Sequence, residues 1–149
     1  MRLRVYLDTS VFSAFLDDAV QVRQRETQDL FARLGDYEAS TSEIGREELM
    51  RTPDRGLRDR LRSLLEQVNV IELTPDMRQL AESYLQAGVF TSAMFMDSLH
   101  VAAAVLSRQD VLLSWNFRHL VNRRRRALIA ELNTLLGLPS IEILAPPEL

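Results

Sequence analysis

Three acidic side chains lie in sequence contexts where a buried charge is costly. Asp8 follows an apolar, strand-like segment, and Asp97 heads the apolar stretch MDSLHVAAAVL. Glu48 shares a predicted helix face with Ile44 and Leu49. Carboxylates that converge repel one another, and a divalent cation compensates that repulsion. Such oxygen ligands suit Mg²⁺ or Mn²⁺, so the three residues predict metal-dependent phosphodiester hydrolysis or another phosphoryl transfer.

Each carboxylate also has a purely structural interpretation. An aspartate near a helix start satisfies free backbone N–H groups, which would explain Asp97 unless its helix begins as early as Ser92. Glu48 is the inward carboxylate of its helix, whereas Glu47 falls on the polar side. Because most glutamates on helices are solvated, Glu48 becomes a candidate only in combination with Asp8 and Asp97.

Two polar residues near a later predicted strand are candidates for the same site. Asn116 follows predicted strand 111–114, so Asn116 and Asp8 should meet at one edge if both strands belong to a parallel sheet. Ligands bind at the carboxyl ends of the strands in such sheets. Ser114 is a candidate for positioning water or the metal.

Four further residues have competing interpretations. Thr9 and Ser10 either donate hydrogen bonds near Asp8 or cap a helix, and we favour capping for Ser10. His119 either contacts substrate phosphate or packs as a structural or capping histidine. We expect His100 to be structural.

The charge balance restricts any nucleic-acid contact to a local patch. The chain has 18 basic and 21 acidic side chains and a formal net charge of −3. A run of arginines spreads around a predicted helix, so only part of it faces any one surface. Trp115 either stacks a base or, more commonly for a lone tryptophan beside a buried strand, packs in the core or at its rim. The candidate arginines are Arg118, Arg123, Arg124, Arg125 and Arg126.

The composition excludes several classes of enzyme. The chain has no cysteine, which removes disulfides, thiol catalysis and thiolate metal sites. All 18 basic residues are arginine, so phosphate loops, Schiff-base enzymes, kinases and phosphorelay receivers, which require lysine, are excluded. Two histidines cannot form a three-histidine metal site. Carboxylates therefore have to carry any catalysis.

Length and hydropathy predict one domain, residues 1–149. With 46% apolar and 26% charged residues, the chain can bury a core. Its longest apolar run, residues 101–106, is too short to cross a membrane. The first residues, MRLRVYLDTS, do not resemble a secretory signal, so we expect a cytoplasmic protein.

Alternating strands and helices predict an α/β fold with a parallel sheet covered on both faces. The predicted strands are 3–7, 37–40, 68–73, 111–114 and 141–144. The predicted helices are 10–16, 22–34, 43–51, a segment from the Thr52-Pro53-Asp54 break to residue 67, 74–87, 92–107, a segment from Phe117, and 123–136. Gly45 weakens its helix but lets another backbone approach closely.

Four segments resemble one known family. VYLDTSVFSAF, TSEIGREEL, MDSLHVAAAV and LLSWNFRHL occur in the order and spacing seen in PIN domains, particularly VapC-like toxins and their bacterial relatives. The resemblance covers essentially the whole chain. It implies a three-layer fold with a mostly parallel central sheet of about five strands, and an endoribonuclease that uses Mg²⁺ or Mn²⁺. The acidic metal-site positions of the family correspond to Asp8, Glu48 and Asp97.

One position departs from the family pattern. Many relatives have a fourth aspartate where this chain has Asn116, which is expected to contribute an amide oxygen or a bound water but no negative charge. The resemblance implies an RNA substrate and, for a VapC-like toxin, a homodimer and a cognate antitoxin. An alternative, favoured by Asn116, is a catalytically weak module that binds RNA or a protein partner. A haloacid-dehalogenase-like phosphatase is disfavoured, because position 10 is serine and the chain has no lysine.

Overall fold

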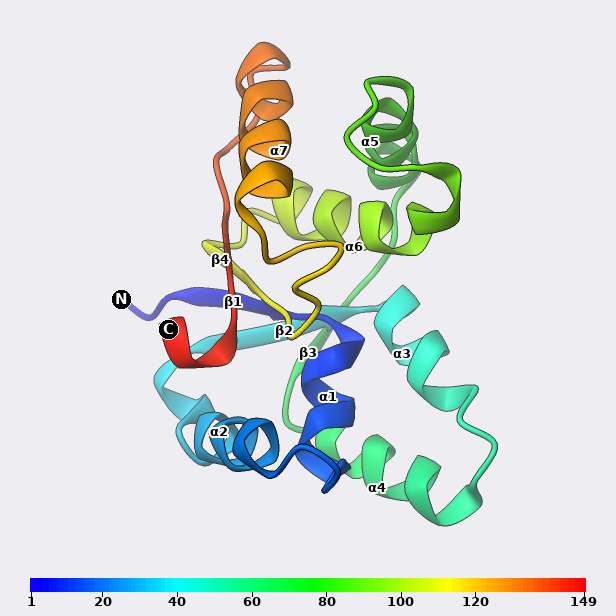
Figure 1. Cartoon of the computed structure of the whole chain (residues 1–149), viewed down its shortest axis with the longest axis vertical. Coiled ribbons are helices and arrows are strands. Elements are labelled where there is room, and N and C mark those ends of the chain that lie inside the picture. Colours follow the sequence, from blue (N-terminus) through cyan, green and yellow to red (C-terminus); the bar gives the residue numbers. More distant parts are fainter.

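A sheet of five parallel strands forms the centre of the computed structural model, which describes residues 1–149 (Figure 1). The strands are β1 (Arg4–Leu7), β2 (Glu38–Ser42), β3 (Asn69–Ile71), β4 (Val111–Leu113) and β5 (Glu142–Leu144). Their order in the sheet is β3-β2-β1-β4-β5, and every neighbouring pair is parallel. The predicted α/β class with about five strands is therefore confirmed, although β2 extends two residues beyond its predicted end.

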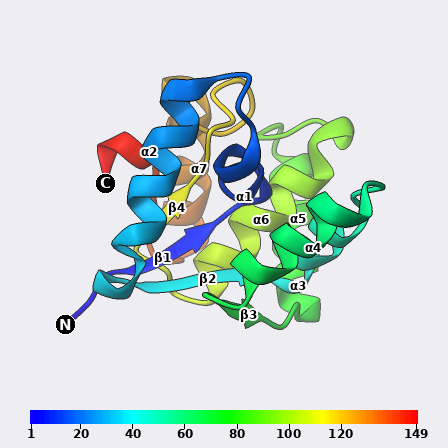
Figure 2. The same ribbon diagram turned by 90° about the horizontal axis from the view of Figure 1, so that it is seen from below.

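Helices cover both faces of this sheet. The α-helices are α1 (Thr9–Leu16), α2 (Gln21–Ala32), α3 (Glu43–Met50), α4 (Arg55–Leu65), α5 (Pro75–Gln86), α6 (Phe95–Leu106) and α7 (Arg123–Leu135). Short 3₁₀ helices are η1 (Leu34–Asp36), η2 (Ser92–Met94) and η3 (Pro146–Glu148). Figures 1 and 2 show α1, α2 and α4 on one side of the sheet and α5, α6 and α7 on the other. None of the helices combines the length and the apolar character that a membrane span requires.

The strand order creates a switch point between β1 and β4. The chain adds β2 and β3 on one side of β1 and later places β4 and β5 on the other side. Leu7 at the end of β1 pairs with Leu113 at the end of β4. Asp8 and Ser114 are therefore neighbours at the carboxyl edge, and the Asp8 amide donates to the Leu113 carbonyl at 3.2 Å. In open α/β sheets, this is the place where ligands bind.

Helix α6 lies in the interior of the molecule. Residues 98–105 are all buried, and α6 packs against α3, α5 and β4. A helix that is apolar on every side belongs in a core, so α6 is a fixed support for Asp97 in its first turn.

Two predicted helices differ in the structure. The segment from Phe117 is not a helix: residues 117–122 form turns and bends, because the Asn116 carbonyl accepts from the amides of Leu120 and Val121. The predicted helix 92–107 is divided into η2 and α6, so Asp97 is in the first turn of its helix after all.

Gly45 allows α3 to lie close to β2. A Cβ atom added at Gly45 would collide with Oγ1 of Thr41, whose side chain is fully buried. It would also lie 3.6 Å from a carbon of the His100 ring. The close approach is found, but its partners are side chains of β2 and α6 and not another backbone.

Candidate active site

Asp8 is buried at the carboxyl end of β1, where three donors hold its carboxylate. Its backbone is extended (φ −79°, ψ 174°), and its side chain caps α1 by accepting from the Ser10 amide at 3.0 Å. The Ser10 hydroxyl also donates to Oδ1, and the Ser114 hydroxyl donates to Oδ2 at 2.6 Å. The prediction that Ser10 caps α1 is wrong, because Ser10 already lies inside the first turn and Asp8 occupies the capping position. Thr9, half-buried at the start of α1, takes no part in these bonds.

Ser10 and Ser114 connect Asp8 to the turn that follows β4. The Ser10 hydroxyl accepts from the Trp115 amide at 2.8 Å, and the Ser114 hydroxyl accepts from the Asn116 amide at 2.9 Å. Asn116 in turn accepts the His119 amide at its side-chain oxygen, at 2.9 Å. The side-chain oxygen of Asn116, which was expected to contribute to the metal site, therefore orders this turn instead.

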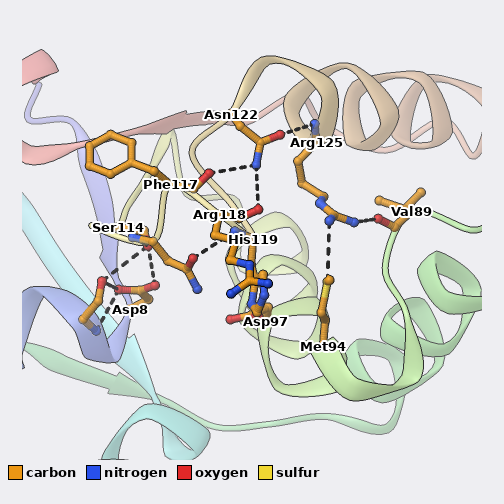
Figure 3. A network of polar contacts seen from close by, with 12 residues as sticks. Asp8, Val89, Met94, Asp97, Ser114, Phe117, Arg118, His119, Asn122 and Arg125 are labelled. Carbon is orange, nitrogen blue, oxygen red and sulfur yellow. Dashed lines mark hydrogen bonds and ion pairs between the residues drawn. The ribbon is translucent and has the colours of Figure 1, made fainter.

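Asp97 points to His119 (Figure 3). Its Oδ2 lies 2.9 Å from His119 Nδ1, and the two side chains are 21% and 32% exposed. The residue at the capping position of α6 is Met94, which makes no side-chain capping bond. The His119 ring is held by this carboxylate and still reaches solvent.

Glu48 ends a chain of hydrogen bonds that runs into the core. Its Oε1 lies 2.6 Å from His100 Nε2, and His100 Nδ1 lies 2.6 Å from the Tyr6 hydroxyl. The Tyr6 hydroxyl is 2.7 Å from Ser42 Oγ. Because a carboxylate only accepts hydrogen bonds, His100 Nε2 carries a proton and donates to Glu48, while Nδ1 pairs with the Tyr6 hydroxyl. His100 is structural, as expected, but it also fixes Glu48.

Burial dominates the electrostatics of the site. It raises the pKa of Asp8 above the usual aspartate value, and the nearby Asp97 carboxylate adds to the increase. His100 and the hydrogen bonds from Ser10 and Ser114 act in the opposite direction. Burial also raises the pKa of the Tyr6 phenol, which keeps it a hydrogen-bond donor. Asp8 and Asp97 are therefore close enough to repel, and a cation would relieve that repulsion.

The three predicted carboxylates do not form a ready-made cluster. No group of three or more His, Asp or Glu side chains lies close enough together to hold an ion. The expected convergence of Asp8, Glu48 and Asp97 is therefore not found, because Glu48 and Asp97 each bind a histidine. Carboxylate oxygens and the repulsion between Asp8 and Asp97 still fit a hard divalent cation.

The structure divides the candidate arginines into two groups. Arg118, Arg123 and Arg124 are exposed. Arg125 is buried, donates to the Val89 carbonyl and lies 4.8 Å from the centre of the Phe90 ring, because helical spacing turns one residue of the run inward. Arg126 pairs with Glu148 at 3.2 Å.

We expect Asp8→Asn to stabilise the metal-free protein at neutral pH. Because the folded pKa of Asp8 is raised, the folded state binds this proton more tightly, and stability falls as pH rises above the unfolded value. Asparagine removes that penalty, which is about 1.4 kcal/mol for each unit of pKa shift. Thermal unfolding in EDTA should give the variant a higher Tm at pH 7 and no advantage near pH 4. A lower Tm at pH 7 would contradict the argument.

Comparisons with known proteins agree on one fold. The PIN domain family matches residues 5–119. The toxin VapC20 of Mycobacterium tuberculosis, described as cleaving the sarcin–ricin loop, has a TM-score of 0.60 and 17% identity over 77% of this chain and 92% of its own. A chain of a toxin–antitoxin complex from Klebsiella pneumoniae has a TM-score of 0.58 and 19% identity, and the match covers 77% of this chain and 88% of that chain. A chain of DNA-bound VapBC from Salmonella typhimurium has a TM-score of 0.57 and 16% identity, and the match covers 97% of this chain and 98% of that chain. No curated protein sequence matches the chain.

Proposed function

This chain belongs to the PIN domain family, and from that premise we propose that it is an endoribonuclease that hydrolyses RNA phosphodiester bonds with Mg²⁺ or Mn²⁺. The observation that carries the proposal is the position of Asp8. It is buried at the switch point of a parallel sheet, where burial raises its pKa and the Asp97 carboxylate adds to the increase. A buried carboxylate with a raised pKa is unfavourable for stability and is typical of functional sites.

The residues of the site have distinct proposed roles. Asp8, Asp97 and Glu48 would hold the cation, which supplies an activated water and stabilises charge on the phosphoryl group. Ser10 and Ser114 fix the Asp8 carboxylate. His100 and His119 orient the other two carboxylates, as outer partners of metal ligands generally do. Asn116 completes the site by ordering the turn that carries His119.

The proposed RNA contact uses exposed arginines beside this site. Arg118 directly precedes His119, and Arg123 and Arg124 begin α7 after the same turn. Guanidinium groups there would bind phosphates of the substrate backbone and offset the carboxylates.

We also propose a cognate antitoxin as partner and a homodimer as the assembled form. Similarity to chains of toxin–antitoxin complexes supports the antitoxin, and the family resemblance supports the homodimer. The proposal includes a cytoplasmic location, because cellular RNA is the substrate.

The test is cleavage of a labelled pool of structured RNAs by the purified protein. We expect discrete cuts in Mn²⁺ or Mg²⁺ and none in EDTA, because the carboxylates alone cannot activate water for this attack. Calorimetry should detect binding of the metal in the same buffer.

A catalytically weak binding module is the second candidate, favoured by Asn116 and by the absence of a ready-made three-carboxylate cluster. RNA or partner binding that is equal with metal and with EDTA, together with no cuts and no detectable metal binding, would replace the nuclease proposal with this one.

A further inference from the structure

A groove opens on one flank of Asp8. It has a volume of ≈ 280 Å³. Its lining includes Ser10, Ser13, Asp17, Arg23, Trp115 and Asn116. Ser10 is also bonded to Asp8, so the groove begins directly at the proposed catalytic centre. Figure 3 shows Phe117 on the side of Ser114 and Asp8, turned away from Asp97 and His119. Asn116 of the groove lining accepts the His119 amide, so the groove borders the turn that carries His119.

Arg23 on α2 makes cation–π contacts with two aromatic rings at this groove. Its guanidinium carbon lies 5.4 Å from the centre of the Trp115 ring and 5.4 Å from the centre of the Phe117 ring. The rings are 6.2 Å apart and inclined at 63°. Arg23 forms none of the ion pairs in the structure and is exposed. Cation–π contacts of this kind order a guanidinium, and the exposure of Arg23 leaves part of its surface available.

Trp115 supports this arrangement and is itself unavailable for stacking. It is only 8% exposed, and its indole N–H donates to Thr27 Oγ1 at 2.8 Å. The packing interpretation of Trp115 is therefore confirmed. Phe117, in contrast, is 44% exposed, although a phenyl ring gains nothing from water.

The charge of the groove favours a base over a phosphate. Asp17 and Arg23 contribute one negative and one positive charge to the lining. A phosphate in the groove would meet the Asp17 carboxylate, whereas a base is uncharged and has a flat face. Single-stranded RNA is commonly bound by stacking unpaired bases on aromatic rings or on arginine planes.

We propose that this groove binds one unpaired RNA base next to the cleaved phosphate, stacked on the Arg23 guanidinium that Trp115 and Phe117 hold in place. The inference rests on the proposed function, because it takes RNA as the substrate. It adds a base subsite that makes the enzyme prefer an unstacked nucleotide, as in a loop or a single strand.

The experiment measures binding without cleavage. Asp97→Asn protein in Mg²⁺ is titrated with fluorescein-labelled eight-nucleotide single-stranded RNAs, one intact and a series with a single abasic site at each position. We expect the abasic site at one position to weaken binding by about 5- to 100-fold, the range that stacking of one base contributes. Equal affinity for the intact RNA and for every abasic RNA overturns the proposal and leaves a protein segment as the occupant of the groove.

Arg23→Lys in the same background separates stacking from charge. Lysine keeps the positive charge but has no plane, so the difference between intact and abasic RNA should disappear while the dependence of affinity on salt is unchanged. Arg25→Lys, on the exposed side of α2, is the matched control and should keep the full difference. A full difference in Arg23→Lys contradicts the proposal.

The design also separates this inference from the nuclease proposal. Base-dependent binding that Arg23→Lys removes supports the subsite even if the wild-type protein cuts no RNA. Conversely, metal-dependent cleavage by the wild type with no base-dependent binding rejects the subsite and leaves the nuclease proposal in place.

Discussion

Replacing Asp97 by asparagine should lower the rate of RNA cleavage by about 10²- to 10⁴-fold, the range expected when one member of a catalytic group is removed. The side chain keeps its shape, and an amide oxygen can still face His119 Nδ1 across the 2.9 Å contact. What disappears is the negative charge beside Asp8, which the proposed cation requires. The loss should therefore appear as weaker metal binding as well as slower cleavage.

The measurement is the cleavage rate as a function of Mn²⁺ concentration for the wild type, Asp97→Asn and the control Asp29→Asn. Asp29 is an exposed aspartate of α2, so its variant should cleave as the wild type does. Circular dichroism and Tm should show that all three proteins are folded. Cleavage by Asp97→Asn at the wild-type rate and metal dependence would remove Asp97 from the site.

Gly45→Ala should destabilise the protein by about 1–3 kcal/mol, the typical cost of overpacking a close contact. Alanine is the better helix former by about 1 kcal/mol, so an exposed glycine in α3 would give the opposite sign. Here the new methyl group collides with Thr41 Oγ1 in a fully buried position, and the steric cost exceeds the helix gain. Displacement of α3 should also move Glu48 away from His100 and slow cleavage.

Urea unfolding of a double-mutant cycle tests the cause of this loss. Thr41→Ala removes the colliding hydroxyl, so Thr41→Ala/Gly45→Ala should be more stable than the sum of the single effects predicts. Gly35→Ala is the matched control, because nothing lies within 4 Å of the added Cβ. Additive effects at positions 41 and 45 would show that the collision is not the cause.

The sequence predicted the sheet because the alternation of strands and helices leaves parallel pairing with crossovers as the simplest arrangement. It placed Asp8 and Asn116 at one edge for the same reason. The turn after β4 was harder to predict. Residues 117–122 are helix-compatible by composition, but Asn116 accepts two backbone amides and forms a turn instead.

The partners of the site residues depend on contacts that spacing along the chain does not encode. The apolar neighbours of Glu48 and Asp97 predicted that both carboxylates point inward. The histidines that contact them come from other elements, His100 from α6 and His119 from the turn after β4. No sequence pattern identified Arg23 as a site residue, because its aromatic partners, Trp115 and Phe117, are distant from it in the sequence and follow β4.

The hydrogen bond between Ser114 and Asp8 joins residues 106 positions apart. During synthesis, the first hundred residues carry Asp8, Glu48 and Asp97 but none of Ser114, Asn116 and His119. β4 must emerge from the ribosome and insert beside β1 before the carboxylate of Asp8 is held in place. Contacts of such long range form late in folding. The proposed site of a nascent chain is therefore expected to remain incomplete until the residues through His119 have been made.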